Sequence, residues 1–419
     1  MVLSLKREIL RYFVPQNDIP LSVILSFSLV ILNVVKNLCI RLRVNYEKNL
    51  IIGGILFVLF LTPSKICAEE FRRALPGRSF SFPQDHFSHP EFKTEWWYYS
   101  GHLQSPDGKS YGYQLTFFRT GLKRETKNQK SKWAIQNLYF AHLAFTDESK
   151  GRFEYREKIH RGSLGEAGAS PYTPKEKTFR IWIENWSVEG SEHGMQNHFL
   201  KAGDKDFGIE LMLTPEKNPV IHGQKGISQK AEGKGRASHY YSITRLKTEG
   251  KLFLKGAEVP VHGMSWMDHE FGSNQLREYQ VGWDWFSIQL ENGVDLMFYQ
   301  IRHRDGKIDP YSSGTIISSE GKNELFSLKE FQIEVLENWK SQKSGALYPS
   351  KWRLKVPGSH IELVLSPTVK DQELITKEST RVTYWEGSVK IEGKYQNHLI
   401  KGMGYVELTG YAKPFAKGI

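Results

Sequence analysis

Tyr111-Gly-Tyr-Gln-Leu-Thr-Phe-Phe-Arg119 is a run in which side chains of two kinds alternate. The odd-numbered positions of this run hold Tyr111, Tyr113, Leu115 and Phe117, and a Gln and a Thr stand between them. Successive side chains of a strand point to opposite faces of the sheet. This period of two therefore predicts a β-strand with one buried face.

The same alternation recurs on both sides of this run. Further strands are expected at 133–145, 179–188, 207–213, 240–246, 283–290, 295–302, 352–356, 361–365 and 404–411. Turn pairs stand between them, at Asp107-Gly108, Asn292-Gly293, Asp305-Gly306, Glu320-Gly321 and Pro357-Gly358. Amphipathic helices are scarce, and 328–340 fits either a short helix or another strand. The sequence predicts an antiparallel all-β protein.

A weak internal repeat indicates two similar sheets. Residues 96–103 align with 283–290, and each segment is followed by a turn with Gly and then a strand that ends in Arg, at Arg119 and at Arg302. Closure into barrels would remove exposed strand edges, and a small barrel can hold one ligand in its lumen. We place the junction near Gly272, which gives domains at 69–272 and 273–419.

Composition agrees with a globular chain of more than one domain. The 419 residues are 39% hydrophobic and 25% charged, with 57 Lys+Arg against 46 Asp+Glu. The basic residues are dispersed through turns such as 123–132 and 225–236, without a basic helix, a zinc knuckle or an RNA-binding signature. Nucleic acid is therefore not an expected partner.

The first 68 residues have the character of an export leader. Residues 21–35 and 50–61 are apolar, but neither run reaches the ~20 residues of a comfortable membrane span. The second run precedes Ile66-Cys67-Ala68, which fits a secretory signal cleaved after Ala68. A true start near Val44 would make this signal complete. An uncleaved membrane anchor stays open, whereas lipidation of Cys67 is disfavoured because Ile66 precedes it.

Export is compatible with the cysteine content. Both cysteines, Cys39 and Cys67, lie in the leader, so the mature chain needs no disulfide. We expect a periplasmic or secreted protein, with membrane association through the leader if it is retained.

Two polar clusters stand out between aromatic residues. The first, 85–97, fits a loop that caps a barrel mouth, with Trp96 and Trp97 on opposite faces of a strand and Glu95 paired with a cation. The second is Val261 to Gly272, in which three ionisable residues follow one another at 268–270. Burying a lone charge costs several kcal/mol, so this cluster is either a salt-linked domain junction or a functional site.

Other chemistries lack a motif. His, Asp and Glu are frequent, but no H-E-x-x-H or cysteine ligand set occurs, and the neighbours Asp268 and His269 would face opposite sides of a strand. A metal is therefore not expected. The sequence contains no G-x-S-x-G motif that would indicate a secreted serine hydrolase. It also contains no glycine-rich loop of the kind that binds phosphate.

Four ordered motifs, 85–98, 111–119, 266–272 and 282–287, resemble the lipocalin-like AttH and carotenoid 1,2-hydratase (hydroxyneurosporene synthase) family. The resemblance extends from Phe82 to the C-terminus. It implies two lipocalin-like β-barrel domains, which agrees with the internal repeat. It also implies a secreted or periplasmic protein, often tied to ABC exporters, with an apolar ligand.

In the hydratase branch of that family, water adds across an isolated C=C of an acyclic carotenoid without a cofactor. Such a reaction needs an acid that protonates the alkene. It also needs aromatic faces that stabilise the carbocation, and a desolvated cation over such a face gains about 2 kcal/mol. By resemblance the acid falls on Asp268 and the aromatic residue before it on Trp266, where the hydratases have Tyr. A His-x-Trp pair falls on His239 and Tyr241. The Asn that follows Asp-His in the hydratases is Glu270 here, as in the AttH-like branch.

Two functions are therefore expected. In the first, the protein binds an isoprenoid or lipid between the aromatic side chains of Trp96, Trp97, Trp283 and Trp285 and adds water to it. Asp268 is the proton donor, Trp266 and Tyr241 flank the cation, and His239 orients the water. In the second, the protein is a carrier or chaperone that passes a lipid to an ABC-type exporter and does no chemistry.

Overall fold

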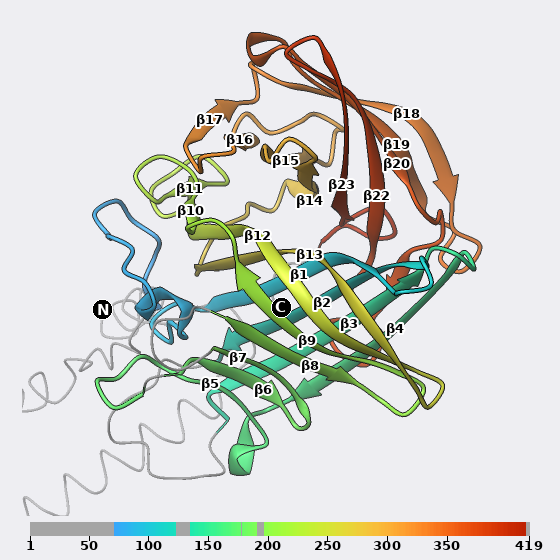
Figure 1. Ribbon diagram of the computed structural model, residues 1–419. Helices are drawn as coiled ribbons and strands as arrows, with labels where there is room; N and C mark the ends of the chain where they lie inside the picture. The colour runs from blue at the N-terminus through green and yellow to red at the C-terminus, as the bar shows by residue number, and fades with distance from the viewer. Residues whose placement is uncertain (1–70, 123–134, 177, 191–196, 416–419) are drawn as a thin grey trace, which may run out of the picture. The chain divides into compact units, whose positions relative to one another are not determined.

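The computed structural model describes residues 71–122, 135–176, 178–190 and 197–415 (Figure 1). The expected signal, its cleavage after Ala68, the start near Val44 and the question of Cys67 all lie outside these residues. Within the described ranges, no helix has both the length and the apolar character that a membrane span requires.

The chain forms two antiparallel sheets, which confirms the all-β prediction and the pair of barrel-like domains. The first sheet contains β1 (Thr94–Gln104), β2 (Ser110–Gly121), β3 (Asn137–Asp147), β4 (Arg152–His160), β5 (Ala167–Ala169), β6 (Arg180–Ile183), β7 (Trp186–Gly190), β8 (His198–Gly203), β9 (Phe207–Pro215), β10 (Val220–Ile221), β11 (Ser228–Gln229), β12 (Ala237–Leu254) and β13 (Ala257–Gly272). Its order is β4-β3-β2-β1-β13-β12-β9-β8-β7-β6-β5, with β10 and β11 paired to β12. The two ends of the sheet approach each other, since Lys158 of β4 donates to Glu184 between β6 and β7 at 2.6 Å.

The second sheet is a more open half-barrel. It contains β14 (Gln280–Leu290), β15 (Asp295–His303), β16 (Ser313–Ile317), β17 (Asn323–Ser327), β18 (Gln332–Lys340), β19 (Leu347–Val356), β20 (Ile361–Pro367), β21 (Glu373–Ile375), β22 (Thr383–Tyr395) and β23 (His398–Leu408). Its order is β17-β16-β15-β14-β23-β22-β20-β19-β18, and β21 pairs with β22. The chain passes from one sheet to the other between Gly272 and Gln280. The described residues include three short 3-10 turns: η1 (Gln84–His86), η2 (Ser163–Gly165) and η3 (Pro357–Ser359).

Side-chain alternation on the strands separates a core from an outer face. Trp97, Leu115, Phe117 and Met267 belong to one buried cluster inside the first sheet. A ligand was expected in the lumen of a barrel. The lumen of the first sheet is instead filled by core side chains, because the large aromatic residues at every second strand position point into it. The second sheet has its own buried cluster, which includes Phe286, Ile288, Trp352 and Val406.

The outer faces of the two sheets contact each other, and this contact positions the candidate site. Tyr98 of β1 donates its hydroxyl hydrogen to Glu386 of β22 at 2.8 Å, and Trp285 of β14 donates to the Tyr240 hydroxyl of β12 at 3.1 Å. A third cluster of aromatic and apolar residues from both sheets surrounds these bonds.

One strand prediction differs from the structure, and one open alternative is decided by it. Residues 179–188 form β6 and β7 instead of one strand, since a turn at Glu184, with φ of 53°, reverses the chain. Residues 328–340 are resolved in favour of a strand, β18. At Gly293 and Gly306, φ values of 84° and 82° show the left-handed turns that the Asn-Gly and Asp-Gly pairs predict.

Candidate functional site

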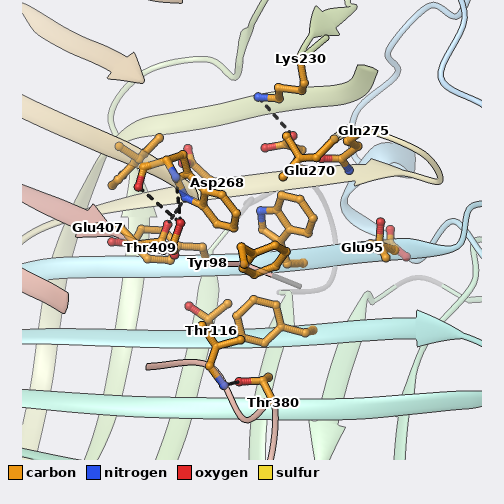
Figure 2. Close-up of a pocket in the computed structure, with 18 of the residues that line it drawn as sticks. Glu95, Tyr98, Thr116, Lys230, Asp268, Glu270, Gln275, Thr380, Glu407 and Thr409 are labelled. Atoms are coloured by element: carbon orange, nitrogen blue, oxygen red, sulfur yellow. Dashed lines mark hydrogen bonds and ion pairs between the residues drawn. The ribbon is translucent and has the colours of Figure 1, made fainter. Parts of the chain in front are cut away.

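A cavity of about 440 Å³ lies between the outer faces of the two sheets. This volume is typical of a small-molecule pocket. The first sheet contributes residues of β1, β2, β3, β12 and β13, and the second contributes residues of β14, β15, β22 and β23. Side chains that line it include Trp96, Tyr98, Thr116, Phe118, His142, Lys230, Tyr240, Asp268, Glu270, Trp283, Trp285, Tyr299, Tyr384, Glu386 and Glu407. Its walls combine aromatic side chains with acidic and basic groups, several of which Figure 2 labels.

Strand register brings Asp268 to this cavity. Asp268 lies between Tyr98 of β1 and Ser242 of β12 in the paired strands, so the three side chains point to the same face. The Asp268 carboxyl accepts hydrogen bonds from the Tyr240 hydroxyl at 2.7 Å, from Trp266 Nε1 at 2.7 Å and from the Ser242 hydroxyl. This geometry holds the carboxyl in one orientation.

The protonation of Asp268 follows from its burial. Loss of hydration and the nearby charge of Glu270 raise the pKa of Asp268 to about 7, although its three hydrogen-bond donors oppose the shift. A carboxyl with this pKa is partly protonated at neutral pH, so it can act as a general acid there.

Two more carboxyls enter the cavity from the second sheet. Glu386 and Glu407 are directly opposite each other on β22 and β23. Burial raises the pKa of Glu407 to about 7, and Trp283 Nε1 donates to that carboxyl at 3.1 Å. Burial and the charge of Glu407 raise the pKa of Glu386 well above its ordinary value. Figure 2 shows Asp268, Tyr98 and Glu407 in the same part of the cavity.

Lys230 and Glu270 form an ion pair at another part of the wall. The Lys230 ammonium lies 3.3 Å from the Glu270 carboxylate, 4.0 Å from the centroid of the Tyr299 ring and 5.1 Å from that of Tyr240. The negative charge of Glu270 and contact with the aromatic rings hold this buried cation in place.

Similarity to known proteins extends over both sheets. The model of the AttH-like family matches residues 73–411. The chain belongs to the AttH-like family. A crystal structure of a putative AttH from Nitrosomonas europaea superposes with a TM-score of 0.72 at 31% identity, covering 81% of this chain and 99% of that one. These findings confirm the family resemblance and its lipocalin-like barrel fold.

A hydratase is among the relatives. Kievitone hydratase of Fusarium solani subsp. phaseoli is 25% identical over 221 residues, which are 50% of this chain and 58% of that protein. The match thus spans little more than half the length of this curated relative. The crystal structure of kievitone hydratase from Nectria haematococca has a TM-score of 0.58 at 15% identity, covering 82% of this chain and 98% of that one, and so shares the fold.

The structure of this AttH-like chain brings four of the expected site residues to the cavity. Asp268, Trp96, Trp283 and Trp285 line it. Trp266 lies behind Asp268, to which it donates a hydrogen bond, and its ring packs edge-to-face on Trp285 with centroids 6.3 Å apart.

Three other expected residues face away from Asp268. Trp97 and Tyr241 belong to the core of the first sheet, and Trp97 stacks on His269 with ring centroids 4.7 Å apart. His239 packs against Phe92 and Phe271, and its Nδ1 lies 3.2 Å from the Gly226 carbonyl oxygen. The expected roles of Tyr241 and His239 beside Asp268 therefore require correction. On β12 the even-numbered Tyr240 and Ser242 face Asp268, and the odd-numbered residues face the opposite side.

Inside the first sheet, Glu95 is the centre of a buried polar network. The Arg119 guanidinium lies 3.1 Å from the Glu95 carboxylate, which confirms the cation expected there. His89 Nδ1 and His269 Nε2 lie 2.8 and 2.9 Å from the same carboxylate. The ligand atoms of these two histidines and Glu95 lie within 4.8 Å of one another, the spacing of a metal site. Arg119 neutralises the Glu95 carboxylate, and both imidazoles lie within hydrogen-bond distance of it, so these residues form a buried polar network around an ion pair.

Sequence reasoning missed Tyr98, Tyr240, Glu386 and Glu407. The two glutamates carry a signal that could have been used, because each is a lone acid inside an apolar or aromatic strand, next to Trp385 and Val406.

Proposed function

We propose that this protein is a cofactor-free hydratase that adds water across an isolated C=C of an apolar isoprenoid, in the cavity between the two sheets. The observation that carries the proposal is Asp268, a buried carboxyl with a pKa raised to about 7 inside an aromatic cavity. The relationship to kievitone hydratase supports the same class of reaction.

The first step is protonation of the alkene. Asp268 gives its proton to one carbon of the double bond, whose π electrons form the new C–H bond. A carbocation remains on the other carbon. Three hydrogen-bond donors, on Tyr240, Trp266 and Ser242, then stabilise the Asp268 carboxylate that is left.

The second step is capture of the cation by water. Aromatic faces of Trp96, Tyr98 and Trp285 surround the cavity, and a desolvated cation over such a face gains about 2 kcal/mol. The water oxygen bonds to the cationic carbon and loses one proton, and the product is a tertiary alcohol when that carbon carries three substituents.

The substrate class follows from the size and polarity of the cavity. A volume of about 440 Å³ suits a compact molecule with an isoprenoid group, or one end of a longer polyene such as an acyclic carotenoid. Apolar walls favour such a group, and Lys230 and Glu270 provide a polar anchor for a hydroxyl on the remainder of the molecule.

The location and partners of the protein are part of the proposal. The apolar leader ending at Ala68 supports export, and an apolar ligand supports contact with a membrane or with an ABC-type exporter. A carrier that passes a lipid to such an exporter is the alternative, and it predicts binding without turnover.

The test uses kievitone and an acyclic carotenoid as probes with the purified mature chain. We expect hydration of at least one probe by the wild-type protein and none by Asp268→Asn, while both proteins bind the probe. Binding without hydration by the wild-type protein would favour the carrier. Equal hydration by both proteins would remove Asp268 from the mechanism.

A further inference from the structure

The second sheet supplies a pair of carboxyls that the protonation step does not use. Glu386 of β22 and Glu407 of β23 are cross-strand neighbours on one face. Directly opposite residues of an antiparallel pair have Cβ atoms about 4.5–5.5 Å apart, so these carboxyls act on each other. Both line the cavity that contains Asp268.

No nearby cation of the cavity neutralises this pair among the described residues. Arg119 is bound to Glu95 at 3.1 Å, and Lys230 is bound to Glu270 at 3.3 Å. The groups that contact the pair are neutral donors, since Tyr98 donates to Glu386 at 2.8 Å and Trp283 to Glu407 at 3.1 Å. Two anions in this position would repel each other, which favours a state with one shared proton.

One oxygen of the pair is free to bind something else. Glu386 Oε1 accepts the Tyr98 hydrogen bond, but Glu386 Oε2 is buried without a hydrogen-bond partner among the described residues. A buried carboxyl oxygen of this kind requires a donor, and water is the donor that the hydration reaction supplies.

We propose that Glu386 and Glu407 together form the base that takes a proton from the attacking water. This inference rests on the proposed function and adds the residues that complete its second step. Glu386 Oε2 forms the hydrogen bond with the water. The member of the pair that carries no proton takes the proton that the water loses.

The protons balance over one turnover. Asp268 loses one proton to the alkene, and the water oxygen forms the new C–O bond as one O–H bond of water breaks. That proton goes to the carboxylate of the pair. Water in the cavity then returns a proton from the pair to the Asp268 carboxylate, so both groups are ready for the next substrate.

Exchange with heavy water separates the two steps. In D₂O, Asp268 delivers deuterium to the alkene, and a cation that is not captured returns to alkene by losing a proton. Glu386→Gln and Glu407→Gln should therefore lower hydration of kievitone or the acyclic carotenoid by about 10²-fold. The recovered alkene should still gain deuterium in these variants, whereas Asp268→Asn should show neither hydration nor label.

Glu373→Gln is the matched control. Glu373 is a buried glutamate of the same sheet, and its carboxyl accepts hydrogen bonds from Ser341, Ser344 and Tyr348, away from the cavity. This variant should keep both hydration and labelling. Unfolding temperatures of all variants report whether each protein is folded at the assay temperature.

Several results would overturn the inference, and they differ from those that overturn the proposed function. Wild-type hydration rates in Glu386→Gln and Glu407→Gln, or loss of both hydration and label in these folded variants, would exclude the pair as the base. Failure of the wild-type protein to hydrate or label either probe would instead contradict the proposed function.

Infrared spectroscopy tests the pair without any substrate. The carbonyl stretch of a protonated carboxyl should be present in the wild-type protein at neutral pH. Glu386→Gln and Glu407→Gln should each remove the same part of this absorption band, because the two carboxyls share one proton. Identical spectra for the wild-type protein, Glu386→Gln and Glu407→Gln in this region would show that the pair holds no proton and would contradict the inference.

Discussion

Asp268 is oriented by three donors and kept partly protonated by its burial, and these two properties suit a general acid. We expect Asp268→Asn to lower turnover by about 10²- to 10⁴-fold, the usual contribution of such a group. Ligand affinity should change little, because the amide is nearly the same size. Steady-state kinetics with a fluorescence binding titration check both parts. An equal loss of binding and turnover would instead give Asp268 a structural role.

The pH dependence of the reaction should follow the protonation of the same residue. Asp268 works only in its acid form, and its pKa is raised to about 7. We therefore expect kcat/KM to fall as pH rises above about 7, because the acid form of Asp268 is then lost. A rate profile measured with stable protein across that range checks this expectation, and a rate that rises with pH would contradict it.

Single residues show where the sequence was informative. Asp268 was predicted from a family motif, and the structure places it in the cavity. Tyr241 was expected beside it, but Tyr240 is the residue that donates to Asp268. A difference of one position reverses the face of a strand, so a motif with uncertain alignment on β12 could not decide between two adjacent tyrosines.

At the scale of an element, β1 presents Trp97 to the core and Trp96 to the cavity. We expect Trp97→Ala to lower the free energy of unfolding by about 3–5 kcal/mol, as is usual for a large buried aromatic side chain. Trp96→Ala should cost less stability and more ligand affinity. Chemical denaturation and binding titrations of both variants check this. Equal effects on stability would contradict the division of faces.

The contact between β1 and β2 contains the buried ion pair of Glu95 and Arg119. Glu95→Gln should lower the free energy of unfolding by about 3–5 kcal/mol, because it leaves the Arg119 charge buried without an anion. The control is Glu154→Gln, which breaks an exposed pair with Arg152 and should cost less than about 1 kcal/mol. Similar small losses in both variants would show that the network is not important for stability.

Strands were predicted well where one face is polar and less well where the pattern is ambiguous. The alternation of 111–119 falls within β2 as expected. Residues 179–188 have apolar residues on both sides of Glu184-Asn185, and the pattern alone does not reveal that these two residues reverse the chain. Edge strands such as β18 are largely exposed and lack a clear apolar face.

For the whole molecule, the candidate site lies between two sheets instead of inside a barrel. Tyr98 and Glu386, whose hydrogen bond links the sheets, are 288 residues apart in the chain. No local pattern predicts such a pairing, because it depends on how the outer faces of two separately patterned sheets meet. The internal repeat predicted that two sheets exist, and their contact could not be derived from it.

The carboxyls at this contact should make stability depend on pH. The pKa values of Asp268 and Glu407 are raised from 3.8 and 4.5 to about 7. Between those values each folded carboxyl keeps a proton that the unfolded chain has lost, so each contributes a decrease in the free energy of unfolding as pH rises. From about pH 5 to about pH 8 we expect a decrease on the order of 1 kcal/mol or more for each group.

Denaturant titrations at several pH values check this decrease. Buried histidines with lowered pKa values, such as His142 and His198, add a slope of opposite sign in the wild-type protein and its variants. The double variant Asp268→Asn with Glu407→Gln should therefore gain stability relative to the wild-type protein as pH rises, and Glu154→Gln should not change the slope. A double variant whose stability relative to the wild-type protein stays constant over the same interval would contradict protonation of the buried carboxyls.

The central claim is that the cavity adds water to a double bond. The most direct test is mass spectrometry of the protein's co-purified ligand, and of kievitone and an acyclic carotenoid as probes, after incubation in water enriched in oxygen-18. The account predicts that a molecule gains one labelled water with the wild-type protein and none with Asp268→Asn. Bound molecules that remain unlabelled with both proteins would contradict it and identify the protein as a carrier.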